Sequence, residues 1–223
     1  MYLHSIIILD QDAMKKNLLV LILCTVVLPI ITTAQDTLYT FTNMEEALQR
    51  PQEVLRLDLS GQDINFSLEA LRQFKNIEYL SLRNDHLKEI PEEVFDLEQL
   101  KVLDLSGNDF VILPREIKKL KNLEELYLNE EERLDLKQSI DALIGLPNLR
   151  TLHLEGDQIA VFPENIFELE NLEYLYLKDN ELVEIPQGIN RMNRLKLVDL
   201  QSNPIPPPIQ NSFNREGNVL IRF

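Results

Sequence analysis

The sequence has 223 residues, of which 44% are hydrophobic and 26% charged, a composition typical of one folded domain rather than of a disordered chain. Its 37 acidic and 22 basic residues give a formal net charge of -15 at pH 7, which disfavours binding to nucleic acid or to anionic lipid. The one cysteine is Cys24, so the chain after it can form neither a disulfide nor a cysteine nucleophile.

Residues 1–34 are expected to be an export leader. Lys15 and Lys16 form a positive segment after Met14, residues 18–31 are apolar, and Thr32-Thr33-Ala34 supplies the small residues of a cleavage site. Translation is expected to start at Met14, and the exported chain at Gln35. The sequence therefore predicts a secreted, periplasmic or cell-surface protein.

Two alternatives apply to the leader. It could be retained as a membrane anchor, but its apolar stretch is interrupted by Pro29 and is shorter than the roughly 20 residues that span a bilayer. It could also carry a lipid on Cys24, but the preceding Leu23 is larger than the residue that lipoprotein signals place there. Cleavage leaves no membrane-inserted segment.

A pattern of the form Leu-x-x-Leu-x-Leu-x-x-Asn-x-Leu recurs through the rest of the chain. Each unit starts 23 residues after the previous one, except that the fifth starts 26 residues after the fourth. Every apolar position of the pattern is apolar in every unit, apart from Arg133. The units begin at Val54, Ile77, Leu100, Leu123, Leu149, Leu172 and Leu195.

These residues, with LKVLDLSGNDF at 100–110 as an example, make residues 54–205 resemble the leucine-rich repeat family. The second half of the units resembles the 23-residue type of bacterial surface proteins, plant disease-resistance proteins and Ras-pathway scaffolds. It contains Ile90-Pro91, Leu113-Pro114, Phe162-Pro163 and Ile185-Pro186, each with an apolar residue three positions after the proline. The resemblance implies an α/β solenoid, a right-handed horseshoe of seven repeats. It has a concave parallel β-sheet and a convex side of short helical or extended segments.

The pattern has a physical reason. In each strand two leucines, such as Leu57 and Leu59, point inward while the residues between them face solvent, and neighbouring units must stack to bury the leucines. The asparagine position can satisfy backbone groups at the turn. It holds Asn108, Asn180 and Asn203, but Gln62, Asp85 and Asp157 in other units. These positions of successive units form a ladder of side chains along the turns. An ionised aspartate cannot donate a hydrogen bond, so we expect this ladder to be weaker at Asp85 and Asp157.

The fourth unit and the two flanks depart from the pattern. Residues 136–146 predict an amphipathic helix. Residues 129–133 include three glutamates and predict a solvated acidic turn, since the spacing of the glutamates matches no calcium loop. Residues 35–53, with a short helix near Met44, and residues 206–223, with a closing strand near Val219, are expected to cap the ends of the stack.

No nucleophile elbow, phosphate-binding loop or zinc-binding helix is present in the sequence, so we expect no enzyme activity, no cofactor and no metal site. The alternative is a glycan hydrolase that uses the carboxylates expected on the concave face, Asp58, Asp104 and Asp199. A second alternative is a structural spacer of the cell envelope without a ligand.

The leading hypothesis is a monomeric, non-catalytic protein that binds another protein, or a glycan, through its concave face. Aromatic residues gather in units four to six, where Tyr127, His153 and Tyr176 should form a row on neighbouring strands. Tyrosine is enriched at binding hot spots, although it also simply suits strands. The expected partner-binding residues are Tyr79, Asp104, Glu125, Tyr127, His153, Tyr174 and Tyr176.

Overall fold

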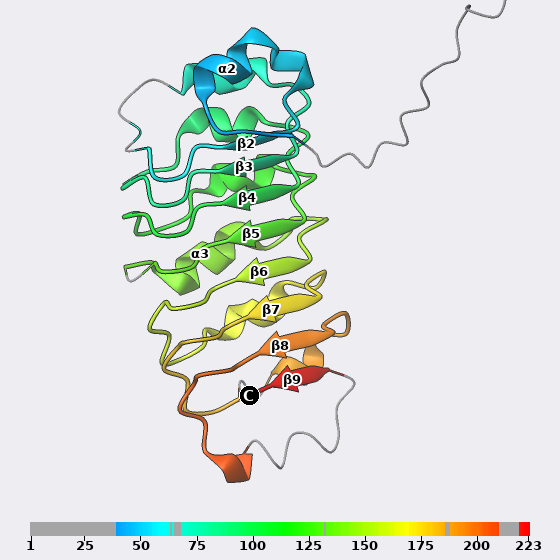
Figure 1. Ribbon diagram of the computed structural model, residues 1–223. Coiled ribbons are helices and arrows are strands. Elements are labelled where there is room, and N and C mark those ends of the chain that lie inside the picture. Colours follow the sequence, from blue (N-terminus) through cyan, green and yellow to red (C-terminus); the bar gives the residue numbers. More distant parts are fainter. Residues whose placement is uncertain (1–38, 63, 65–67, 132, 186–187, 210–218) are drawn as a thin grey trace, which may run out of the picture. The chain divides into compact units, whose positions relative to one another are not determined.

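The computed structural model describes residues 39–62, 64, 68–131, 133–185, 188–209 and 219–223. The expected leader therefore lies outside the described residues. Within them, one open sheet of nine parallel strands runs in chain order from β1 to β9, stacked one above another as Figure 1 shows. The strands are β1 Thr40–Phe41, β2 Arg56–Asp58, β3 Tyr79–Ser81, β4 Val102–Asp104, β5 Glu125–Tyr127, β6 Thr151–His153, β7 Tyr174–Tyr176, β8 Leu197–Asp199 and β9 Leu220–Arg222.

Short helical segments connect the strands. Most are short 3-10 helices, and three of these follow Pro91, Pro114 and Pro163. Val94, Ile117 and Ile166, each three residues after its proline, are fully buried. The segments are α2 Met44–Gln49, η1 Pro51–Glu53, η2 Glu69–Gln73, η3 Glu92–Asp96, η4 Arg115–Lys119, α3 Leu136–Leu143, η5 Glu164–Glu168 and η6 Ile189–Arg191. A parallel sheet with helical returns confirms the predicted α/β solenoid.

The strands pair without any shift of register. Leu57 aligns with Leu80, Leu80 with Leu103, and so on to Val198 and Ile221. Because every unit enters the sheet at the same position of the pattern, its inward leucines form continuous columns, and these leucines have essentially no solvent exposure. The residues on either side of the central one, at the third and fifth positions of each unit, therefore share the opposite, solvent-facing surface of the sheet, called here the sheet face.

The sheet extends beyond the predicted units at both ends. β1 pairs with β2, and β9 pairs with β8, so each flanking segment adds a strand. Leu197 and Asp199 of β8 are only 7% and 6% exposed, whereas the sheet-face residues of β5, β6 and β7 are half-buried. The open part of the sheet face therefore ends before β8.

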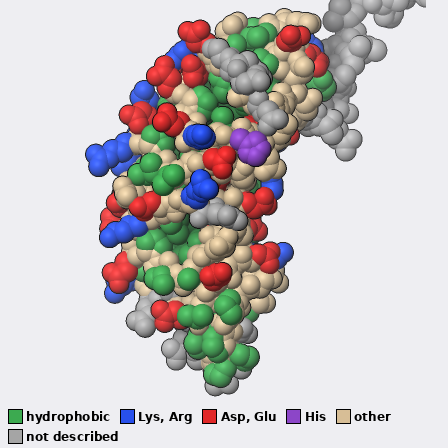
Figure 2. Space-filling view, turned by 90° about the vertical axis from the view of Figure 1, so that its left-hand side faces the viewer, with side chains coloured by type: hydrophobic (Ala, Val, Ile, Leu, Met, Phe, Trp, Pro, Cys, Tyr) green, Lys and Arg blue, Asp and Glu red, His purple; other side chains and the backbone are tan. Residues whose placement is uncertain are grey.

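Some hydrophobic side chains reach the surface in the turns after the strands. Val161 is 84% exposed and Val183 is 57% exposed. Figure 2 shows hydrophobic side chains in patches among acidic and basic ones on one side of the molecule. Scattered exposed valines are normal in folded proteins, so they do not by themselves identify a site.

Candidate functional site

An aromatic row crosses the sheet face. The register places Tyr127 beside His153, and His153 beside Tyr176. The ring centroids of Tyr127 and His153 are 3.9 Å apart with an interplanar angle of 10°, and those of His153 and Tyr176 are 4.4 Å apart at 5°. These separations are near the spacing of adjacent strands, about 4.8 Å, so the three rings stack on one another from strand to strand along the sheet.

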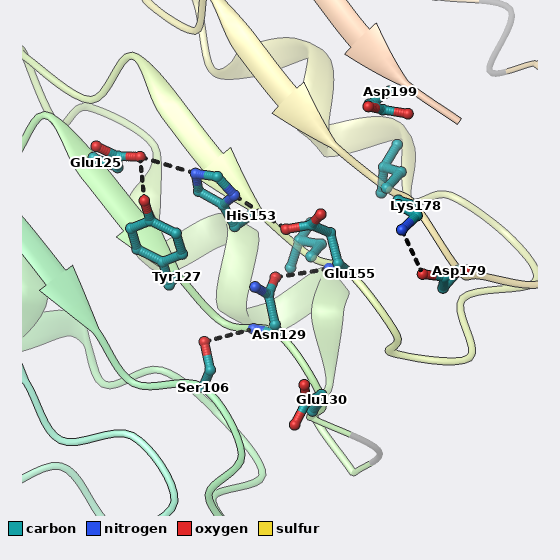
Figure 3. A network of polar contacts seen from close by, with 12 residues as sticks. Ser106, Glu125, Tyr127, Asn129, Glu130, His153, Glu155, Lys178, Asp179 and Asp199 are labelled. Carbon is teal, nitrogen blue, oxygen red and sulfur yellow. Dashed lines mark hydrogen bonds and ion pairs between the residues drawn. The ribbon is translucent and has the colours of Figure 1, made fainter. Parts of the chain in front are cut away.

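Two carboxylates hold the central ring of this row, as Figure 3 shows. Oε1 of Glu125 accepts a hydrogen bond from the Tyr127 hydroxyl at 2.7 Å and lies 2.9 Å from Nε2 of His153. Oε2 of Glu155 lies 3.2 Å from Nδ1 of the same ring. The backbone N–H of Glu155 in turn donates to Oδ1 of Asn129 at 2.8 Å. The His153 side chain is only 12% exposed, so stacking and polar contacts together fix its orientation.

The network also shifts the pKa values of its members. The hydrogen bond with His153 lowers the pKa of Glu125, against the opposing effect of burial, and the Tyr127 hydroxyl lowers it further. Burial raises the pKa of the Tyr127 phenol, and the hydrogen bond to Glu125 adds to this rise. At neutral pH Tyr127 is therefore a hydrogen-bond donor and Glu125 an ionised acceptor.

Two further tyrosines occupy the second line of positions on the sheet face. Tyr174 pairs in register with Thr151 and Leu197, and the Lys196 ammonium lies 5.7 Å from its ring centroid. Tyr79 lies on β3, where the guanidinium carbon of Arg56 is 3.8 Å from its ring centroid, a cation–π contact. Burial raises the pKa of Tyr79.

The aspartates of the sheet face support turns. Oδ1 of Asp104 accepts the backbone N–H of Ser106 at 3.0 Å, and Oδ1 of Asp199 accepts that of Gln201 at 3.1 Å. Asp58 makes the same contact with Ser60. Each carboxylate thus has a local structural task two residues along the chain, whereas a hydrolase would require two of them to flank one substrate bond.

The asparagine ladder lies in the turns below the sheet face. The amide of Asn108 donates to the carbonyls of Leu82 and Leu105 at 2.8 and 2.6 Å, and its oxygen accepts the N–H groups of Asp85 and Leu87. Asn180 and Asn203 make the equivalent contacts. The predicted role of these asparagines is confirmed.

The predicted solvated acidic turn is wrong for Glu131. This residue takes the asparagine position of the fourth unit, where it is only 2% exposed, and its Oε1 accepts the N–H of Asn108 at 2.8 Å. Its own N–H donates to Oδ1 of Asp157 at 2.7 Å. Burial raises the pKa of Glu131 to about 8 and that of Asp157 to about 7. Because the strands pair without a shift of register, Glu131 lies in line with the asparagines of the other units. Its neighbour Glu130 instead pairs with Arg83 at the surface.

The structure thus brings four of the seven expected site residues into one network, namely Glu125, Tyr127, His153 and Tyr176. Tyr174 lies beside them on β7, Asp104 is the register neighbour of Tyr127, and Tyr79 stands apart with Arg56. Sequence reasoning missed Glu155 and Asn129. Their position in the repeat could have identified them. Both are the seventh residue of a unit, two residues after the fifth, and residues two apart tend to lie on the same side of an extended chain.

The described residues lack two features, a membrane-spanning helix and a metal-binding cluster. None of their helices is long and apolar enough to cross a membrane. No group of three or more His, Cys, Asp or Glu side chains among them is placed to hold a metal ion.

Comparisons with known proteins agree with this architecture. None of the curated proteins matches the chain. Among solved structures, internalin C2 of Listeria monocytogenes is similar at 25% identity and a TM-score of 0.54, over 69% of this chain and 64% of that one. The internalin inlF of the same organism has 17% identity and a TM-score of 0.54, over 77% and 55%. Drosophila Toll, in its complex with Spatzle, has 21% identity and a TM-score of 0.60, over 75% and 22%. The chain therefore spans about half of inlF and a smaller part of Toll.

Family models cover most of the sequence. A model described as a leucine-rich repeat region matches residues 42–146, and a leucine rich repeat model matches residues 147–205. Together with the in-step strands and the asparagine ladder, these matches show that the chain belongs to the leucine-rich repeat family.

Proposed function

We propose that this chain is an exported, non-catalytic protein that binds a protein partner on its sheet face. The observation that carries the proposal is the Tyr127–His153–Tyr176 stack, a preformed aromatic surface whose side chains have already lost much of their rotamer freedom. Such rigid aromatic side chains bind at low entropic cost. The proposed contact residues are Tyr79, Asp104, Glu125, Tyr127, His153, Tyr174 and Tyr176.

The family supports the general class of function. Leucine-rich repeat proteins such as internalins are protein-binding scaffolds, and the family and its structural neighbours are in general non-catalytic. The structure of Toll is that of a complex with Spatzle, so this fold holds a protein ligand there. Fold alone does not fix function, so the proposal for this chain rests on the aromatic stack.

The proposal is tested by replacing Tyr127, Tyr174 and Tyr176 together with alanine. We expect the affinity for a partner isolated from surface or envelope extracts to fall by at least about 30-fold, since hot-spot truncations each cost about 2 kcal/mol or more without adding simply. Isothermal titration calorimetry with the purified partner measures this loss. Thermal unfolding of the same variant shows whether the repeat domain remains folded.

Matched controls come from the helical side of the solenoid. Glu92 and Glu164 are exposed residues of η3 and η5, and their replacement by alanine should leave affinity unchanged. If these variants lose binding while the triple variant keeps it, the partner docks on the helical side. If extracts contain no specific partner at all, the chain is better described as an envelope spacer.

Export is tested on the native protein. The leader features of residues 14–34 favour cleavage after Ala34, and the surface or extracellular character of the internalins and of Toll supports an exported location. Mass spectrometry of the natively produced protein should therefore find Gln35 as the first residue, with residues 35–53 and 206–223 kept as the proposed caps. Retention of residues 18–31 would instead indicate a membrane anchor.

A further inference from the structure

The aromatic stack has two outer ring faces. His153 lies between the two tyrosines, so the second face of Tyr127 is directed toward β4 and that of Tyr176 toward β8. In both directions the register partner is an aspartate, because Asp104 aligns with Tyr127 and Asp199 with Tyr176. Each end of the stack therefore presents an aromatic face beside a carboxylate.

At the β8 end the chain supplies its own arginine. Nη1 of Arg222 on β9 lies 3.8 Å from Oδ2 of Asp199, and the Arg222 charge opposes the burial that raises the pKa of Tyr176. The Asp199 side chain is only 8% exposed. At this end the aspartate beside the stack is therefore paired with an arginine of the chain.

The same three types of residue occur near the other end of the sheet. Arg56 on β2 lies over the ring of Tyr79 at 3.8 Å, and Asp58 stands on the same strand as Arg56 and acts on the pKa of Tyr79. An arginine therefore lies over a tyrosine ring at the β2–β3 end, and at the β8–β9 end an arginine pairs with the aspartate beside Tyr176. A planar guanidinium suits a tyrosine beside an aspartate because it can stack on the ring and hydrogen-bond the carboxylate at once.

Between these ends, no arginine of the described residues forms an ion pair with Asp104 or lies over the ring of Tyr127. Strands β3 to β7 lie wholly within the described residues, and none of their third or fifth positions holds a lysine or an arginine. On the nearby turns, Arg83 is held by Glu130 at 2.9 Å. The charged groups on this part of the sheet face are the carboxylates Asp104 and Glu125. We propose that the partner inserts an arginine of an extended basic segment between the outer face of Tyr127 and Asp104.

Charge complementarity favours this occupant over an acidic or purely apolar one. The chain carries a net charge of -15, which attracts a basic segment. Oδ1 of Asp104 accepts the backbone N–H of Ser106, and a carboxylate has further lone pairs for a guanidinium. This inference rests on the proposed function, because it names the kind of partner that the sheet face takes.

The probe is the peptide acetyl-Gly-Arg-Gly-amide, added to the full exported chain labelled with carbon-13 in its tyrosine rings. Nuclear magnetic resonance should show a saturable shift of the Tyr127 ring signal, which is assigned by its loss in Tyr127→Phe. The citrulline analogue keeps the planar group without its charge, and we expect it to bind at least about fivefold more weakly. The lysine analogue should also bind more weakly, since it lacks the planar fork.

Two aspartate variants separate the site from general acidity. Asp104→Asn should weaken the arginine peptide about fivefold or more. Asp58→Asn changes the same charge at the same position of another unit, where the equivalent turn contact is also made, and should leave the affinity unchanged. Equal effects of both variants, equal binding of the citrulline peptide, or a shift confined to Tyr79 or Tyr174 would overturn the arginine site.

The outcomes also keep the two proposals apart. If the triple tyrosine variant loses the natural partner but the arginine peptide does not bind, the sheet face is the binding surface and its ligand is not arginine-led. If the peptide binds at Tyr127 while the triple variant keeps the natural partner, the arginine site exists but that partner docks elsewhere, and the inference fails as a description of the partner.

Discussion

Leu105→Ala is expected to lower the free energy of unfolding of the repeat domain by about 2 to 5 kcal/mol, the usual cost of deleting a fully buried leucine side chain. Leu105 has no solvent exposure and lies in the middle of the stacked units. The cost should be near the upper end, because the in-step register surrounds it with leucines of both neighbouring units, which have little room to collapse into the cavity. Chemical denaturation with and without the substitution measures the difference.

The control is Lys101→Ala in the same unit. The side chain of Lys101 is 43% exposed, and its Nζ lies 2.8 Å from Oε1 of Glu78. Such surface ion pairs contribute only about 0 to 1 kcal/mol. Equal losses of stability in the two variants would mean that the inward and outward positions of the strands are assigned wrongly. A solenoid also couples mainly neighbouring units, so hydrogen exchange should show the loss of protection centred on units two to four.

Much of this fold could be predicted from the sequence, because one period fixes several levels of structure together. The spacing of leucines predicts the strands, and equal spacing predicts strands in register. Register in turn predicts that Tyr127, His153 and Tyr176 stack. The helix expected at residues 136–146 is present as α3, ending at Leu143 two residues before Gly145, whose φ of 90° favours glycine.

Some features could not be predicted because the residue type and its position in the repeat favour different environments. Glu131 reads as a surface residue, since glutamate is almost never fully buried unless it is paired. Its place in the repeat nevertheless carries it into the ladder. Glu155 likewise reads as an ordinary charged turn residue, and although its position in the unit places it on the side of His153, the packing of that ring shows that the two side chains are in contact.

Glu131→Gln is expected to stabilise the domain by about 2 to 4 kcal/mol at pH 9 and by much less at pH 5. Glu131 has a folded-state pKa of about 8, above its ordinary value of 4.5, chiefly because of burial. The folded state therefore holds a proton that the unfolded state releases between these values. The stability that the proton on Glu131 contributes to the wild type is therefore lost as the pH rises from about 4.5 to 8.

The ladder explains why glutamine should relieve this cost. Oε2 of Glu131 is buried with no hydrogen-bond partner among the described residues, and so is Oδ2 of Asp157. An amide keeps the oxygen that accepts the Asn108 N–H and replaces the unpaired oxygen with an N–H donor, as in the asparagine units.

The pH dependence is checked by denaturation of both proteins at pH 5, 7 and 9, with Glu130→Gln as the matched control. Glu130 lies next to Glu131 in the chain, but its side chain is 57% exposed, so its loss should change stability little at any pH. If Glu131→Gln destabilises the domain equally at all three pH values, the glutamate is instead a required member of the ladder. If Glu131→Gln stabilises the domain only at high pH while Glu130→Gln has no effect, the pH dependence of stability comes from the proton bound by the buried Glu131. Asp157→Asn should then also stabilise the domain at high pH. Its stabilising effect should reach its full size above about pH 7, because the folded-state pKa of Asp157 is about 7.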